Sequence, residues 1–221
     1  MVDTKAKILD AAQRVIIGYG ADKATLRLIA KEADVNLAAI NYHFGSKGSM
    51  LDEIFARFFR PLEEDRIRRL DQAEAAAGKE GPEVEEIVRC YLEPFLDLVR
   101  KSPDHNHFLY QLHRPDDSWR RFHGKHQSIA GPGLSRFVDA FAKALPDIPR
   151  QTLLARMAFI QASISWLLNN AWIFADLKIL CGLSLSNQEM VEELVAYTAA
   201  GLRGEIAGME GKPDIRVKGA D

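Results

Sequence analysis

Near the start of the chain, a short stretch contains side chains of the kinds that bind phosphate. Hydroxyl, imidazole and ammonium groups occur together at Thr25, Tyr42, His43 and Lys47. Such groups donate hydrogen bonds to the phosphate oxygens of nucleic acids. Lys47 also follows Gly45-Ser46 at the predicted start of a helix, where the helix dipole favours a negative charge. The spacing therefore predicts a contact with the backbone of DNA.

Residues interleaved with these donors have the chemistry needed to contact base edges. The candidates are Arg27, Leu37, Ala38, Ala39 and Asn41. Arginine favours guanine and asparagine favours adenine, whereas leucine and alanine side chains can pack only against thymine methyl groups. Recognition of bases by hydrogen bonds would then depend on Arg27 and Asn41.

Two short helices must hold these side chains in place. A first helix is predicted from the N-cap Thr25, because apolar residues follow at helical spacing at Leu26, Ile29, Ala30 and Ala33. Asp34 ends it, since aspartate accepts the left-handed backbone of a tight turn. Asn36 caps a second helix that begins at about Leu37 and turns Ile40 and Phe44 inward. This is the pattern of a helix-turn-helix whose second helix enters a major groove.

The first fifty residues resemble the TetR-type transcriptional regulators. The resemblance is carried by the segment Asn41-Tyr42-His43-Phe44-Gly45-Ser46-Lys47, which ends the second helix and opens the next. It implies that Thr25, Tyr42, His43 and Lys47 are the backbone contacts. Two positions depart from the usual pattern: Asp34 stands where the family commonly has glycine, and Asn41 where it commonly has a second tyrosine.

Length and charge agree with a small DNA reader joined to a larger domain. The chain has 221 residues, of which 47% are apolar, so it can bury a core well beyond fifty residues. The net charge is −2, but residues 1–50 hold seven Lys and Arg against five acids, so the basic character lies at the N-terminal end. Neither a long apolar run nor a signal pattern is present, which predicts a cytoplasmic protein with no membrane contact. The two cysteines, Cys90 and Cys181, are expected to be reduced thiols.

Helical periodicity continues along the chain and predicts an all-α fold. We expect a three-helix DNA-binding domain at 1–48, a helical effector-binding and dimerisation domain at 49–207, and a disordered tail at 208–221. The individual segments expected to be helical are 3–19, 25–33, 37–44, 46–70 with a kink at Pro61, 83–101 with an interruption at Pro94, 134–145, 150–180 and 187–206. Residues 75–82 are expected to be a loop and residues 103–133 to be less regular.

The last two long segments are candidates for a dimer interface. Residues 150–180 are apolar nearly all the way round, so this helix must be covered on every side. One side can face the chain's own core and another a second copy; a purely monomeric core is the alternative. The family resemblance also implies a dimer formed by the last two long helices, and two recognition helices would then read a palindromic operator.

The larger domain is expected to bind a small, mostly apolar effector. Candidate pocket residues are Phe108, Trp119, Phe122, Phe137, Trp166, Asn169 and Asn170, although core packing is the commoner role for such residues. The effector would change the spacing of the recognition helices through the helix at 47–70, so that effector and DNA compete. The histidines at 105, 107, 113, 123 and 126 lack the spacing of a structural metal site, and neither metal nor cofactor is predicted.

Two other classes of function remain open. The chain has none of the common catalytic motifs, such as Gly-x-Ser-x-Gly or His-Glu-x-x-His, which argues against an enzyme. A DNA-binding regulator that responds to a protein partner instead of a small molecule is the other alternative. The preferred interpretation is a dimeric, effector-released repressor.

Overall fold

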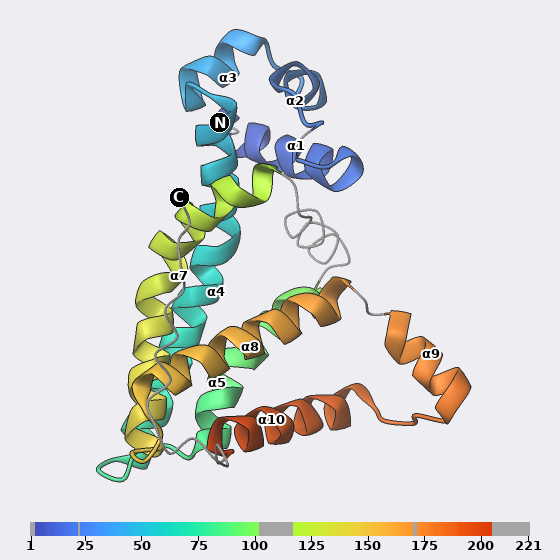
Figure 1. Ribbon diagram of the computed structural model, residues 1–221. Helices are drawn as coiled ribbons and strands as arrows, with labels where there is room; N and C mark the ends of the chain where they lie inside the picture. The colour runs from blue at the N-terminus through green and yellow to red at the C-terminus, as the bar shows by residue number, and fades with distance from the viewer. Residues whose placement is uncertain (1–2, 22, 102–116, 170–171, 205–221) are drawn as a thin grey trace, which may run out of the picture.

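The structure is helical throughout the part of the chain that it describes. The computed structural model covers residues 3–21, 23–101, 117–169 and 172–204, and every regular element in these ranges is an α-helix (Figure 1). The helices are α1 (Thr4–Tyr19), α2 (Leu26–Glu32), α3 (Leu37–Phe44), α4 (Lys47–Ala77), α5 (Val84–Lys101), α7 (Asp117–Ala144), α8 (Arg150–Asn169), α9 (Trp172–Cys181) and α10 (Asn187–Arg203). The all-α prediction is confirmed.

The N-terminal helices form a head at one end of the molecule, with the capping that the sequence predicts (Figure 1). The Thr25 hydroxyl accepts a hydrogen bond from the Leu28 amide at 3.2 Å, and Asn36 Oδ1 accepts one from the Ala39 amide at 2.8 Å. Asp34, between α2 and α3, has φ of 49°, the left-handed conformation that the turn requires. Local side-chain chemistry therefore sets both ends of this helix pair.

α4 connects the head to the rest of the protein. Ser46 caps it, and its first turns pack on α1 through ion pairs of Lys5 with Glu53 and of Arg57 with Asp10, both at 2.6 Å. The same helix then runs on between α5 and α7. α4 is thus one continuous helix that is part of both the head and the body.

α5 and α7 cover the body half of α4, and large apolar side chains fill the space between them. The fully buried ones include Leu70, Ile87, Leu92, Phe137 and Phe141. α8 and α10 project to one side of this body, and α9 lies at their outer end (Figure 1).

Three sequence expectations were wrong about element bounds. α4 continues to Ala77, seven residues beyond Leu70, because alanines are good helix formers and the break comes only at Gly78, with φ of 63°. The predicted irregular section is helical from Asp117, because packing of α7 against α4 outweighs the weak propensity of Gly131, Pro132 and Gly133. The expected single helix 150–180 is present as two helices, α8 and α9, on either side of residues 170–171, which lie outside the described part.

Two further expectations concern membrane-spanning helices and the state of the two cysteines. None of the described helices is both long enough and apolar enough to cross a membrane. Cys90 is buried, Cys181 is exposed, and both are free thiols. The predicted disordered tail at 208–221 lies outside the described residues.

Candidate nucleic-acid interface and effector cavities

The outer surface of α3 carries the predicted base-reading and phosphate-binding side chains. Ile40 and Phe44 point into the core, with 1% and 6% exposure, whereas Tyr42 is 86% exposed. Leu37, Ala38 and Asn41 are exposed as well, and Ala39 and His43 are half-buried. α3 therefore packs one face into the head and leaves the other exposed.

Thr25 and Arg27 lie at the start of α2, beside this surface. Both are exposed. Because capping uses only a lone pair of the Thr25 oxygen, its hydroxyl proton remains available to a phosphate. Lys47, in the first turn of α4, is half-buried. The structure brings all nine predicted DNA contacts to α2, α3 and the start of α4.

The described part of the head has cations that are not neutralised by ion pairs. Glu32 and Asp34 lie near cations of α1: Arg14 contacts Glu32 at 2.8 Å, and Lys7 lies 3.9 Å from Asp34. By contrast, Lys23, Arg27 and Lys31 are exposed and form no ion pair with any residue that the structure describes. This is the electrostatic arrangement expected of a surface that attracts a polyanion.

Aromatic contacts hold the end of α3 in place. The rings of Tyr42 and His43 meet edge to face, with centroids 5.2 Å apart. The Lys5 ammonium lies 5.7 Å from the centre of the buried Phe44 ring. The side chains that would contact phosphate thus stand on a well-packed base.

Of the effector residues expected from the sequence, only Phe137 has a described side chain. Phe137 is fully buried and packs edge to face on Tyr91, with centroids 5.1 Å apart, so it is part of the core. Phe108 and Asn170 lie outside the described residues. Trp119 and Phe122 are in α7, and Trp166 and Asn169 are in α8, but their side chains lie outside the described part. The histidines considered as metal ligands also lie outside it.

Three cavities lined by described residues were not predicted from the sequence. The largest, of about 820 Å³, opens between α4 and α7. A second, of about 500 Å³, lies where α1, α4 and α5 meet, and a third, of about 290 Å³, between α8 and α10. Phe137 lines none of the three.

A buried charged cluster beside the largest cavity was also missed. Arg66 donates to Glu63 at 2.7 Å and to the Tyr91 carbonyl at 2.9 Å, and Tyr91 donates from its hydroxyl to Gln161 at 2.8 Å. Burial raises the pKa of the Glu63 carboxyl, while the neighbouring Arg66 opposes that rise. The available signal was helical spacing, since Glu63 and Arg66 fall between Phe59 and Leu70 on the inward face of α4.

The head and the body each match a sequence profile of known proteins. Residues 8–54 match the bacterial regulatory proteins of the tetR family, and residues 89–201 match the tetracyclin repressor-like C-terminal domain. The chain belongs to the TetR family. Its relatives are transcriptional regulators and not enzymes, and the family binds DNA.

Curated relatives are similar over part of the chain. The probable HTH-type transcriptional regulator YttP of Bacillus subtilis is 38% identical over 58 residues, which are 26% of this chain and 28% of that protein. The HTH-type nicotine-responsive transcriptional repressor HdnoR of Paenarthrobacter nicotinovorans is 36% identical over 73 residues, 33% of this chain and 38% of that protein. The matches thus span about a third of the length of these relatives.

Solved structures share the whole fold. The fatty acid degradation regulator FadR from Bacillus halodurans has a TM-score of 0.63 at 18% identity, covering 93% of this chain and 99% of that one. A TetR-like regulator from Rhodococcus sp. RHA1 has a TM-score of 0.58 at 19% identity, covering 91% and 97%. At these identities the likeness concerns the fold alone.

Proposed function

We propose that this TetR-family protein is a dimeric, ligand-responsive repressor that binds a palindromic operator. The observation that carries the proposal is the exposed face of α3, a helix with a packed inner side and small residues at its start. It lies at the end of the molecule farthest from α10 (Figure 1), in the same head as Lys23, Arg27 and Lys31, which form no ion pair with a described residue. Small side chains at the start of a recognition helix let it sit deep in a major groove.

The contacts divide into two groups by their chemistry. Thr25, Tyr42, His43 and Lys47 would bind phosphates and set the position of α3 on the duplex. Base edges would be read by Arg27, Leu37, Ala38, Ala39 and Asn41. Because only Arg27 and Asn41 are polar, each half-site would be specified at few positions, and a second half-site is needed.

The exposed side of α8 and α10 supports a homodimer through these two helices. Phe159 in α8 is 69% exposed and Tyr197 in α10 is 76% exposed. Small residues surround them on both helices and are exposed too: Ala155, Ala158, Ala162, Ala196, Ala200 and Gly201. Large apolar side chains amid small ones allow close packing of helices from a second copy. The two α3 helices would then read major grooves about 34 Å apart.

α4 offers a route from ligand to DNA. It begins beside the recognition helix at Lys47 and also forms one wall of the largest cavity. At its far end Arg136 of α7 binds Glu74 and lies 3.1 Å from Asp71. A ligand between α4 and α7 would move the nearer part of α4 about this clamp and change the spacing of the two heads, so that DNA is released. The partial identity with a nicotine-responsive repressor is in keeping with ligand control and repression.

Selection from a random pool of duplexes tests the DNA-binding part. The purified protein should enrich an inverted repeat with half-site centres about 10 base pairs apart or a multiple of that spacing. Recovery of duplexes without dyad symmetry would contradict a palindromic operator. Linking the enriched site to a promoter in a reporter strain then separates repression from activation.

Light scattering tests the dimer. The wild-type protein should be dimeric at micromolar concentration, and Phe159→Glu and Tyr197→Glu should be monomeric, because each places a charge in the buried interface. Tyr19→Glu is the matched control, since Tyr19 is 60% exposed in the head. A wild-type monomer, or dimers for both interface variants, would exclude this interface.

A further inference from the structure

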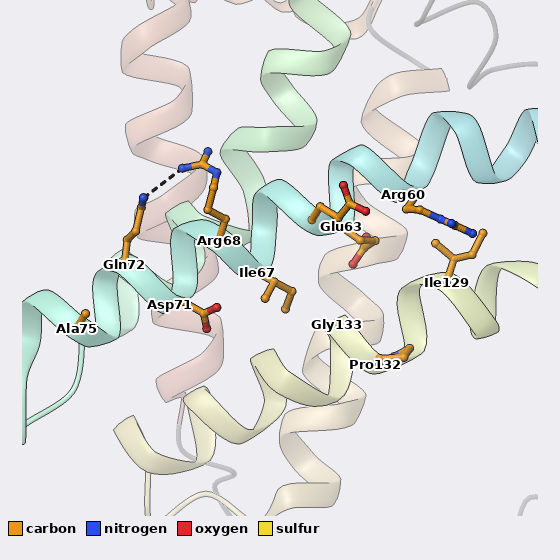
Figure 2. A pocket seen from close by; sticks show the side chains of 11 residues that line it. Arg60, Glu63, Ile67, Arg68, Asp71, Gln72, Ala75, Ile129, Pro132 and Gly133 are labelled. Atoms are coloured by element: carbon orange, nitrogen blue, oxygen red, sulfur yellow. Dashed lines mark hydrogen bonds between the residues drawn. The ribbon is translucent and has the colours of Figure 1, made fainter. Parts of the chain in front are cut away.

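The cleft between α4 and α7 has walls of mixed character. Figure 2 shows Arg60, Glu63 and Ile67 on the α4 wall and Ile129, Pro132 and Gly133 on the α7 wall. Its volume of about 820 Å³ lies in the range of small-molecule sites. Apolar surface comes from Ile67, Ala75, Ile129 and Pro132.

Glu63 differs in burial from every other charged residue that lines these walls. Arg60, Glu64, Arg68 and Asp71 are exposed, whereas the Glu63 side chain is only 10% exposed. Water screens the exposed charges, and of the buried Glu63–Arg66 pair only Glu63 lines the cleft. The Glu63 carboxylate is therefore the polar group around which a bound molecule would be oriented.

One oxygen of this carboxylate has no donor among the residues that the structure describes. Oε1 accepts the hydrogen bond from Arg66, while Oε2 accepts none from any residue that the structure describes. A buried carboxylate oxygen without a donor is unfavourable, so the site favours a molecule that supplies one. A water molecule could do this, but a cationic donor forms a stronger, charge-assisted bond.

Gly133 makes room for that oxygen. A β-carbon at position 133 would lie 2.6 Å from Oε2 of Glu63, too close for any real contact, whereas one at Gly131 would meet nothing within 4 Å. The two glycines flank Pro132 in the same helix and differ only in what they face. The absence of a side chain at position 133 thus keeps the carboxylate oriented toward α7.

We propose that this cleft binds an organic amine, a molecule with an apolar body and a protonated amino group that donates to Oε2 of Glu63. The apolar body would lie on Ile67, Ile129 and Pro132. An anionic ligand is disfavoured because it would meet the buried carboxylate. The two arginines in the walls, Arg60 and Arg68, are exposed, so water screens their charges, and Arg68 is also bound to Asp65. This inference rests on the proposed ligand control, and it names the class of effector.

Three unbranched probes of eight carbon atoms each test the class by titration calorimetry on the full-length protein. Octylamine should bind, 1-octanol should bind at least tenfold more weakly, and octanoate should not bind. Equal affinities for amine and alcohol, tighter binding of octanoate, or no binding by butylamine, hexylamine or octylamine would each overturn the inference.

Two pairs of variants locate the site. Glu63→Gln and Gly133→Ala should each weaken octylamine binding by tenfold or more. Their matched controls, Glu64→Gln in the same wall and Gly131→Ala in the same helix, should bind within twofold of wild type. If Glu63→Gln fails to fold because Arg66 loses its partner, Gly133→Ala decides the question. Wild-type affinity in Gly133→Ala would place the amine elsewhere and overturn the proposal.

Measurements with DNA distinguish a failure of this inference from a failure of the proposed function. Amine binding is measured without DNA, and operator selection is carried out without amine, so either can fail alone. Octylamine should release the selected duplex from wild-type protein but not from Gly133→Ala. Amine binding without release would leave the site intact and contradict its role as an effector site.

Discussion

Arg66 of α4 and Tyr91 of α5 are joined in two ways. The guanidinium donates to the Tyr91 carbonyl at 2.9 Å and lies 4.0 Å from the centre of the Tyr91 ring. The same arginine binds Glu63, and the Tyr91 hydroxyl reaches Gln161 in α8. A single chain of contacts therefore links the cleft beside α4 to the helix proposed for the dimer interface.

Removing Arg66 should strongly destabilise the protein. Arg66→Met leaves the Glu63 carboxylate buried without its partner, which costs about 3–5 kcal/mol. The double variant Glu63→Gln/Arg66→Met should recover a large part of this loss, because no unpaired charge is left inside. Urea unfolding followed by circular dichroism measures both, with Arg68→Met as an exposed control expected to change stability by less than about 1 kcal/mol. Equal losses for the single and double variants would contradict the ion-pair explanation.

Glycine in place of Asp34 should stabilise the turn between α2 and α3. Asp34 has φ of 49°, a conformation that costs a residue with a β-carbon about 1–2 kcal/mol. Asp34→Gly should raise the free energy of unfolding by about 0.5–1 kcal/mol, and Asp34→Val should lower it by about 1–2 kcal/mol. Thermal unfolding of the two variants checks this, with Asp34→Asn as a near-neutral control. A more stable valine variant would show that the turn is not strained.

Base and phosphate contacts should respond differently to substitution. Arg27→Ala should cost about 1–3 kcal/mol on the selected operator and relax preference at one base pair, whereas Lys47→Ala should weaken binding to all duplexes alike and lower the salt dependence. Titrations on operator and random duplexes at several salt concentrations measure both effects. Equal losses on the two duplexes for Arg27→Ala would contradict its assignment to a base.

The contact between α5 and α10 should weaken in acid. The hydrogen bond from Arg203 lowers the pKa of the Glu85 carboxyl from 4.5 to about 2. Because the folded state holds the carboxylate charged, the stabilisation is complete above about pH 4.5 and is lost as the pH falls toward 2. The side chain is 43% exposed, so solvent limits the effect to under about 1 kcal/mol.

Comparing Glu85→Gln with wild type at pH 7 and at pH 3 by urea unfolding tests this prediction. The variant should be less stable at pH 7, and the difference should shrink at pH 3. Glu80→Gln, at an exposed position with no ion pair among the described residues, is the control. A difference that grows in acid would reverse the expected sign.

The sequence alone determined the head of this protein. Thr25, Asp34 and Asn36 act on backbone groups a few residues away, and Ile40 and Phe44 are one turn apart on one helix, so their roles follow from short-range chemistry. The buried and exposed faces of α3 could therefore be predicted residue by residue. Helix type was predictable in the body as well, because apolar spacing is also a local property.

Only the tertiary structure decided how the body is arranged. The local sequence predicts a helix break at Gly131, Pro132 and Gly133. These residues nevertheless lie inside α7, because that helix packs along α4. Glu63 and Gly133 are seventy positions apart, and nothing in either neighbourhood shows that they meet. Local sequence specifies caps and periodicity, whereas a cavity depends on which helix faces which, and that is determined by the packing of the whole chain.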